Sequence, residues 1–151
     1  FWDSQKGLFR AATVRCREHD IWGSAFAVYL GVADKKQSQD IAAYFKSNYD
    51  GIVQHGQLRH LPAGVYWEKG RERDVYQNGA YWATPVGWFV YTLDLVDTAL
   101  ADQTIFDMVQ YFQEFGACEW INGDRRQLPH YLASAALPLA GIRAMLERRQ
   151  K

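Results

Sequence analysis

The sequence has little cysteine, no net charge and no long apolar run, and each absence narrows what the chain can be. Its 2 cysteines, Cys16 and Cys118, form no metal-binding spacing and indicate no redox compartment. The 17 basic and 17 acidic residues cancel, so charge gives no indication of a nucleic-acid or anionic-membrane partner. No apolar run approaches the ~20 residues that span a bilayer. One globular domain of 151 residues, with ample material for a core, is the simplest interpretation.

The start of the chain also lacks familiar signals. It opens at Phe1-Trp2-Asp3 with neither Met nor a signal peptide, so we expect it to begin inside a domain. The sequence therefore does not decide between cytoplasm and periplasm. Aromatic residues, by contrast, are abundant at 15%, with 6 Trp. Surplus aromatic side chains usually pack in cores, but they also form the flat platforms on which sugars stack.

The richest stretch runs from Tyr76 to Trp88, and we expect the rest of the chain to be organised around it. Asn78-Gly79 is a strong turn dipeptide, because both residues tolerate positive φ. Thr84-Pro85 is a typical helix start, with Thr as N-cap and Pro at the first helical position. The helix that follows has two apolar faces, which predicts burial on both sides.

The remaining periodicity predicts an all-α fold. Residues 1–19 alternate around Gly7 and predict an extended, hairpin-like segment, and 52–62 predicts a short strand or two. Two-sided and one-sided helices then alternate along the chain, with the two-sided ones first, third and last. This order indicates concentric helical hairpins, a partial (α/α)6 toroid with a few short β segments in its loops; an ordinary helical bundle is the alternative. The helices are expected at 21–32, 38–49, 85–100, 102–115 and 130–148, the last with Pro138 inside it.

The three loops before the two-sided helices hold the candidate chemistry, and through them the chain resembles the six-hairpin glycosidases. This superfamily includes processing α-glucosidases, trehalases, invertase-like enzymes and amylo-1,6-glucosidase-type proteins. The resemblance covers most of the chain. Three segments carry it: Gly79-Ala80-Tyr81-Trp82-Ala83-Thr84-Pro85, Glu119-Trp120-Ile121-Asn122-Gly123 and His130-Tyr131-Leu132-Ala133-Ser134-Ala135-Ala136.

The resemblance implies that residues 1–151 are the C-terminal part of a glycoside hydrolase catalytic domain, with a carbohydrate substrate and no cofactor. Such enzymes use one carboxylic acid and one carboxylate. Glu119 corresponds to the general base. Asp20 is a possible acid or sugar contact, with a helix N-cap as the structural alternative, and Glu68 is a third carboxylate to consider. The substrate-binding candidates are Trp22, Gln77, Asn78, Tyr81, Trp82 and Trp120, whereas Trp88 is expected in the core.

Other functions stay open. His19, His55, His60 and His130 keep a sugar epimerase possible, because such an enzyme uses histidines as acid and base. A non-catalytic carbohydrate-binding or helical interaction module is the other alternative. Arg59, His55 and His60 are polar contacts or loop surface, and His60-Leu61-Pro62 has no second ligand at metal spacing, so we predict no metal site. We expect the isolated chain to be inactive on glycosides and to form a homo-oligomer through the open side of the partial toroid.

Overall fold

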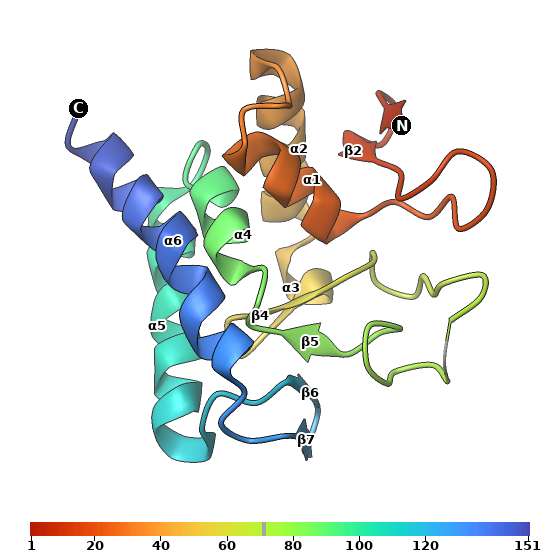
Figure 1. Cartoon of the computed structure of the whole chain (residues 1–151). Helices are drawn as coiled ribbons and strands as arrows, with labels where there is room; N and C mark the ends of the chain where they lie inside the picture. The colour runs from red at the N-terminus through yellow and green to blue at the C-terminus, as the bar shows by residue number, and fades with distance from the viewer. Residues whose placement is uncertain (71) are drawn as a thin grey trace.

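The computed structural model describes residues 1–70 and 72–151 and is a mixed α/β structure. Figure 1 shows the helices gathered on one side, with the sheet and a long connection on the other. The helices of the described residues are α1 (Ile21–Tyr29), α2 (Lys35–Ser47), α3 (Tyr49–Ile52), α4 (Val86–Leu93), α5 (Thr98–Phe115) and α6 (Leu132–Arg149). The strands are β1 (Trp2–Asp3), β2 (Leu8–Phe9), β3 (Val53–Gln54), β4 (Gln57–Arg59), β5 (Tyr81–Trp82), β6 (Trp120–Asn122) and β7 (Arg125–Gln127).

The predicted all-α partial toroid is wrong, because the structure also contains a five-stranded antiparallel sheet. Strands β3-β4-β5-β6-β7 form a five-stranded antiparallel sheet in that order, and β1 and β2 form a separate hairpin. Each strand is only two or three residues long, too short for alternating hydrophobicity to reveal it. The central strand β5 pairs with β4, which lies far upstream, and with β6, which lies far downstream, so the sheet depends on pairings that no local pattern encodes.

The helix α4 is the centre of the packing, as the sequence predicts. It contacts α1, α2, α5 and α6, and Figure 1 shows it (green) between α6 and α1. Val86, Phe89, Val90 and Leu93, on one apolar face of this helix, are fully buried, and Trp88 and Tyr91, on the other apolar face, are partly buried against the core. The helix is shorter than the predicted 85–100, because the chain turns after Leu93.

A new helix starts almost at once. The side chain of Asp97 accepts a hydrogen bond from the backbone N–H of Leu100 at 3.0 Å and caps α5. Asp and Asn are among the strongest N-cap residues, so this aspartate fixes the boundary that the apolar pattern conceals. At the start of α4, Thr84 does not cap: its Oγ1 is buried without a hydrogen-bond partner.

The last helix, α6, is buried on one face only, and that face is not the predicted one. Its buried residues are Ser134, Pro138, Gly141 and Met145. Leu132 and Leu139, expected inside, are 78% and 64% exposed. The reason is a close backbone contact: a methyl group at Gly141 would lie 2.2 Å from the carbonyl carbon of Gly87 in α4. Only residues without a large side chain fit at such a crossing, so glycine stands at the point of contact and the leucine stripe faces outward.

The N-terminal segment is extended, as predicted. Trp2 pairs with Phe9 and Asp3 with Leu8, and Gly7 takes a positive φ of 69° before β2. The helix α2 buries Ile41, Ala42 and Phe45 on one face, which also matches its predicted pattern. Among the described residues, no helix combines the length and apolar character needed to cross a membrane.

Candidate functional site

The three predicted loops meet at one end of α1, α4 and α6 in an aromatic cluster. Ala80, Trp82 and Trp120 are its buried members. Strand pairing explains the meeting, because Tyr81 pairs with Ile121 and this antiparallel register sets Trp82 opposite Trp120 on the same face. The partly buried side chains that complete the aromatic cluster are Trp22, Val75, Tyr76 and Tyr131.

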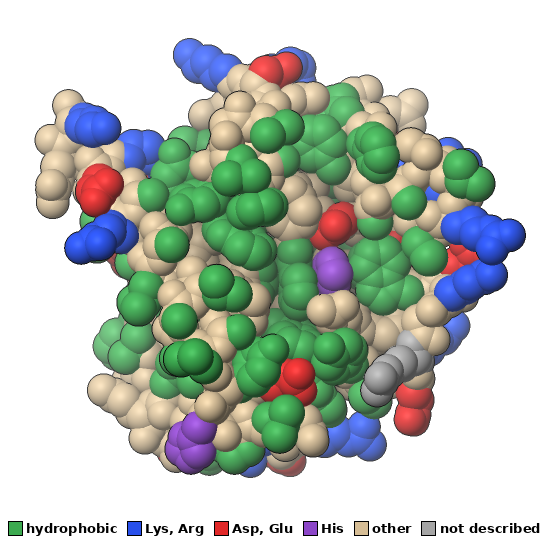
Figure 2. Space-filling view, in the orientation of Figure 1, with side chains coloured by type: hydrophobic (Ala, Val, Ile, Leu, Met, Phe, Trp, Pro, Cys, Tyr) green, Lys and Arg blue, Asp and Glu red, His purple; other side chains and the backbone are tan. Residues whose placement is uncertain are grey.

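A second group, Asp20, Trp22 and His60, borders this cluster. His60 follows β4, and its carbonyl oxygen accepts a hydrogen bond from Ile21 N at 3.0 Å, which fixes the start of α1 against the sheet. The imidazole of His60 stacks on the indole of Trp22 with centroids 4.0 Å apart and planes 6° from parallel. The distance from His60 Nε2 to Asp20 Oδ1 is 3.3 Å. Figure 2 shows a histidine and an acidic side chain among hydrophobic side chains near the centre of this face.

The predicted cap at Asp20 is confirmed. Its Oδ1 accepts a hydrogen bond from Gly23 N at 2.8 Å in the first turn of α1. The same carboxylate therefore caps a helix and orients His60. Trp22 in turn meets Trp82 edge to face, with centroids 5.8 Å apart, and so links the Asp20–Trp22–His60 group to the aromatic cluster.

Several buried polar atoms around these two groups have no hydrogen-bond partner in the described structure. They include Trp22 Nε1 and His60 Nδ1. An unpartnered buried polar group costs about 1–3 kcal/mol, so most such groups are paired in native proteins. Violations of this kind concentrate where function, rather than stability, selects the residues.

Glu119 lies directly before β6 and is half-buried. Its backbone N–H is held by the carbonyl oxygens of Gln127 at 2.8 Å and Leu128 at 3.2 Å, which fixes it in the β6–β7 hairpin. Its neighbour Trp120 is part of the aromatic cluster. Within the described residues, no hydrogen bond or ion pair engages its carboxylate, which leaves this group available for a water molecule or a ligand.

The structure separates the other predicted ligand contacts. Asn78 holds the loop together, because its Oδ1 accepts a hydrogen bond from Trp67 N at 2.8 Å. The carbonyl oxygen of Gln77 accepts another from Trp67 Nε1 at 3.1 Å. Tyr81 lies on the opposite face of the sheet and packs with Tyr111, away from Trp82.

The third carboxylate, Glu68, is exposed, and its Oε2 accepts a hydrogen bond from Cys16 N at 3.2 Å. Its own backbone N–H donates to Glu18 Oε1 at 2.6 Å. Glu68 therefore ties two loops together. No contact in the described structure links it to the aromatic cluster.

Of the four histidines, only His60 adjoins the cluster. His19 Nε2 lies 2.9 Å from Asp3, and its hydrogen bond is the main cause that lowers the pKa of the Asp3 carboxyl to about 2. His55 stacks on Tyr111 beside α5, with centroids 5.0 Å apart, and His130 is exposed. From the sequence, His60 was expected either at a site or on a loop surface. The alternation of β4 is the signal that could have placed it, because residues two apart in a strand share a face and Leu58 pairs with Trp82. His60 therefore lies on the same face as Trp82.

Trp67 and Tyr131 are aromatic residues near the site that were not predicted as ligand contacts from the sequence. Trp67 meets His60 edge to face with centroids 5.0 Å apart, and Tyr131 meets Trp82 in the same way at 6.4 Å. Trp67 precedes the candidate Glu68 and Tyr131 follows the candidate His130, but only the tertiary structure places the two rings beside His60 and Trp82.

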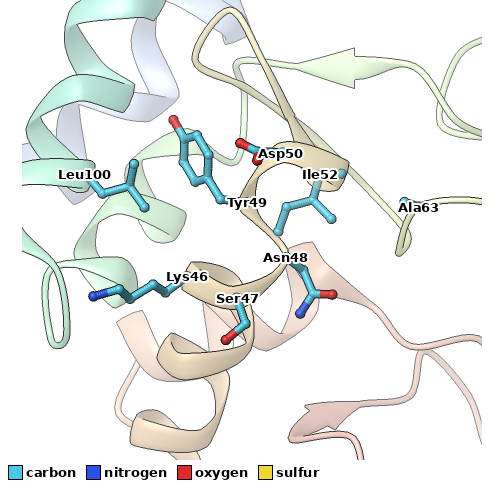
Figure 3. Close-up of a pocket in the computed structure, with 9 residues that line it drawn as sticks. Lys46, Ser47, Asn48, Tyr49, Asp50, Ile52, Ala63 and Leu100 are labelled. Carbon is cyan, nitrogen blue, oxygen red and sulfur yellow. The ribbon is translucent and has the colours of Figure 1, made fainter.

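A separate cavity of about 370 Å³ lies where α2, α3 and α5 meet. Figure 3 shows that its side chains do not converge, since Tyr49 and Asp50 extend to one side and Ser47 and Asn48 to the other. Three of its polar side chains are also engaged by the protein. Lys46 pairs with Asp97 at 3.0 Å, Asn48 donates a hydrogen bond to the carbonyl oxygen of Tyr44 at 2.9 Å, and the hydroxyl of Tyr49 lies 2.8 Å from that of Thr104. We therefore assign it no ligand. In the part of the chain that is described, no group of three or more His, Cys, Asp or Glu is arranged to hold a metal ion.

In comparisons with known proteins, no family model matches the chain, and no curated protein or solved structure matches it either. Function must therefore be argued from the site itself.

Proposed function

We propose that this chain carries a saccharide-binding face and the water-activating carboxylate of a glycoside hydrolase. The observation that carries the proposal is that the carboxylate of Glu119 has no hydrogen bond or ion pair within the described residues, and that Glu119 directly precedes Trp120 at the start of β6. Trp120 belongs to the aromatic cluster, which also gathers Trp22 of α1 and Trp82 of β5. Indole rings are suited to the apolar C–H faces of sugars, and their N–H groups to hydroxyls. The motifs around Gly79, Glu119 and His130 that resemble six-hairpin glycosidases support the same function.

The proposed chemistry needs two carboxyl groups. Glu119 removes a proton from a water molecule as that water attacks the anomeric carbon, and a carboxylic acid protonates the departing glycosidic oxygen. Asp20 is less suited to donating that proton, because its Oδ1 already accepts from Gly23 N and lies beside His60 Nε2. We assign Asp20 to positioning His60 and contacting sugar hydroxyls. The chain by itself then supplies the base but not the acid.

This division suggests a substrate that separates the two roles. Fluoride leaves the anomeric carbon without protonation, so a glycosyl fluoride requires only the base. We expect the protein to release fluoride from α- or β-glucosyl fluoride, and Glu119→Gln to lower turnover at least ~10²-fold, the usual size of a general-base effect. Fluoride release measured with an ion-selective electrode gives the rates.

The matched control is Glu114→Gln, which removes an exposed carboxylate from α5 and should leave the rate unchanged. We expect maltose and isomaltose, whose leaving oxygens need an acid, to be hydrolysed far more slowly than either fluoride. If neither fluoride is turned over, or if Glu119→Gln releases fluoride as fast as the original chain, Glu119 is not the base.

One observation favours a second candidate, a sugar epimerase. A carboxylate-oriented imidazole, as in the Asp20–His60 pair, is a usual acid–base device. However, His60 Nε2 faces Asp20 and Nδ1 is buried, so neither ring nitrogen is presented to a ligand. The epimerase therefore ranks second. It predicts solvent-deuterium exchange into a free sugar, lost in His60→Gln, whereas the hydrolase predicts none.

A further inference from the structure

A second cavity, of about 410 Å³, is lined by residues of the long connection between β4 and β5 and by Cys16 of the N-terminal segment. The residues of the connection that line it are Trp67, Lys69, Gly70, Tyr76, Gln77 and Asn78. Its volume is within the range of about 300–1,000 Å³ found for small-molecule sites. None of the hydrolase chemistry above uses it. Two of the residues predicted to bind substrate, Gln77 and Asn78, lie here and not in the aromatic cluster.

Two aromatic walls connect this cavity to the proposed active face. Trp67 lines the cavity and also meets His60 edge to face, with centroids 5.0 Å apart. Tyr76 lines it as well and meets Trp82 edge to face at the same centroid separation of 5.0 Å. A molecule in the cavity is therefore separated from His60 only by the ring of Trp67, and from Trp82 only by the ring of Tyr76.

The main wall is held in place before any ligand arrives. Trp67 donates its backbone N–H to Asn78 Oδ1 at 2.8 Å and its indole N–H to the carbonyl oxygen of Gln77 at 3.1 Å. A fixed indole loses little conformational entropy on binding, which is the advantage of a preorganised site. With its indole N–H used, the ring offers its apolar surface, while Lys69 and Gln77 offer polar groups beside it.

We propose that this cavity is a second saccharide subsite, which holds a neighbouring sugar residue of a ligand that spans Trp67 or Tyr76 from the aromatic cluster. This inference rests on the proposed function and adds a length requirement to it. The favoured ligand is an oligosaccharide of two or more residues. Free glucose would fill only one of the two positions.

Cys16 provides a direct reporter, because it lines the cavity and is partly exposed. The other cysteine, Cys118, is fully buried, and burial raises the pKa of its thiol, so its reactive thiolate is scarce. Alkylation of the folded protein by iodoacetamide should therefore mark Cys16, and peptide mass spectrometry identifies the modified residue.

The experiment compares alkylation of Cys16 with and without glucose, maltose, isomaltose or maltotriose, while tryptophan fluorescence reports binding in the same samples. We expect an oligosaccharide at about ten times its Kd to slow alkylation about tenfold, because about a tenth of the protein then remains free. Glucose at saturation should change the fluorescence but leave Cys16 reactive.

A matched pair of variants tests the cavity independently. Gln77→Ala should weaken oligosaccharide binding and leave glucose binding unchanged, whereas Gln110→Ala, at an exposed position in α5, should change neither. If an oligosaccharide changes the fluorescence but does not protect Cys16, the subsite is wrong and the proposed function stands. If no sugar of the set changes either signal, the subsite falls together with the saccharide-binding face.

Discussion

One carboxylate oxygen of Asp20 both caps a helix and contacts a histidine. Its Oδ1 caps α1 through Gly23 N and lies 3.3 Å from His60 Nε2. The cap is predictable from local sequence, because an aspartate stands directly before an apolar helix. The contact with His60 is not, because the end of β4 reaches α1 only in the folded chain.

Two substitutions of Asp20 separate its role as the cap of α1 from its contact with His60. Asparagine caps a helix about as well as aspartate but carries no charge for His60, so Asp20→Asn should keep the stability of the original chain. Asp20→Ala removes the cap and should cost about 0.5–2 kcal/mol of unfolding free energy. Urea unfolding followed by circular dichroism measures both. Equal stability of Asp20→Ala and the original chain would show that the cap contributes nothing.

Single positions also show where sequence reasoning about the site fails. Trp22, Trp82 and Trp120 were all predicted as ligand contacts, and the structure brings them together. Tyr81 was predicted with them but faces Tyr111, because successive residues of a strand point to opposite sides of the sheet. An error of one residue in a strand therefore changes the face completely, and a two-residue strand gives no pattern to correct it.

At the level of elements, α6 shows that hydrophobicity alone did not identify the packed face. The leucine stripe is the more apolar one, yet the stripe of Ser134, Pro138, Gly141 and Met145 faces α4. The packed face of α6 is set by the close approach of the two backbones, because Gly87 and Gly141 allow α4 and α6 to lie closer together than leucine side chains would permit. Helix positions along the chain were predicted within a few residues, except that one predicted helix divides between α4 and α5.

The crossing of α4 and α6 gives a sharp test. In an exposed helix, Gly→Ala stabilises by up to about 1 kcal/mol through helix propensity. At Gly141 the added methyl would overlap the backbone of Gly87, so Gly141→Ala should instead destabilise by about 1–3 kcal/mol, the usual cost of overpacking. Ala140→Ser, at the exposed neighbouring position, should stay within about 0.5 kcal/mol. Thermal and urea unfolding measure both, and a stabilised Gly141→Ala would contradict the close crossing.

For the molecule as a whole, the leucines displaced from the core form a surface of their own. The exposed Leu139 and Leu146 border a groove of about 610 Å³ along α6, together with Ile142, which is partly buried against the core. Arg143 and Glu147 line the same groove. We propose that a second copy of this chain covers it. Arg143 Nε lies 3.9 Å from Glu147 Oε1 within one copy, and two antiparallel copies of α6 would let each arginine pair with the glutamate of the other copy instead. The zero formal charge of the chain adds no net repulsion.

This self-association is tested by size. We expect the protein to be a dimer by light scattering, and Leu146→Glu to convert it to a monomer with unchanged circular dichroism, because a charge cannot be buried there without cost. Leu128→Glu, at an exposed leucine outside α6, should remain dimeric. A monomer at every concentration tested, or a Leu146→Glu variant that remains dimeric, would contradict the proposal.

The fold class was the largest error, and its cause lies in the scale of the interactions. The hydrophobic periodicity of a helix is visible within about a dozen residues of sequence. The central role of α4 and the one-sided burial of α2 were therefore predictable. The five-stranded sheet depends on β5, whose partners stand on either side of it in the sequence at long range. The site shares this dependence, because its three loops were predictable one by one but the carboxylate of Asp20 and the ring of His60 meet only in the sheet.

The position of β5 in the middle of the sheet has a consequence for how the chain folds. Both of its pairings close long loops, and the entropy of closing them must be lost before the contacts form. Local helices form on far shorter timescales than such distant strand pairings. The helical layer should therefore be in place first, with the aromatic cluster assembled last and opened most easily, so that amide hydrogens at Tyr81 and Ile121 exchange sooner than those inside α4.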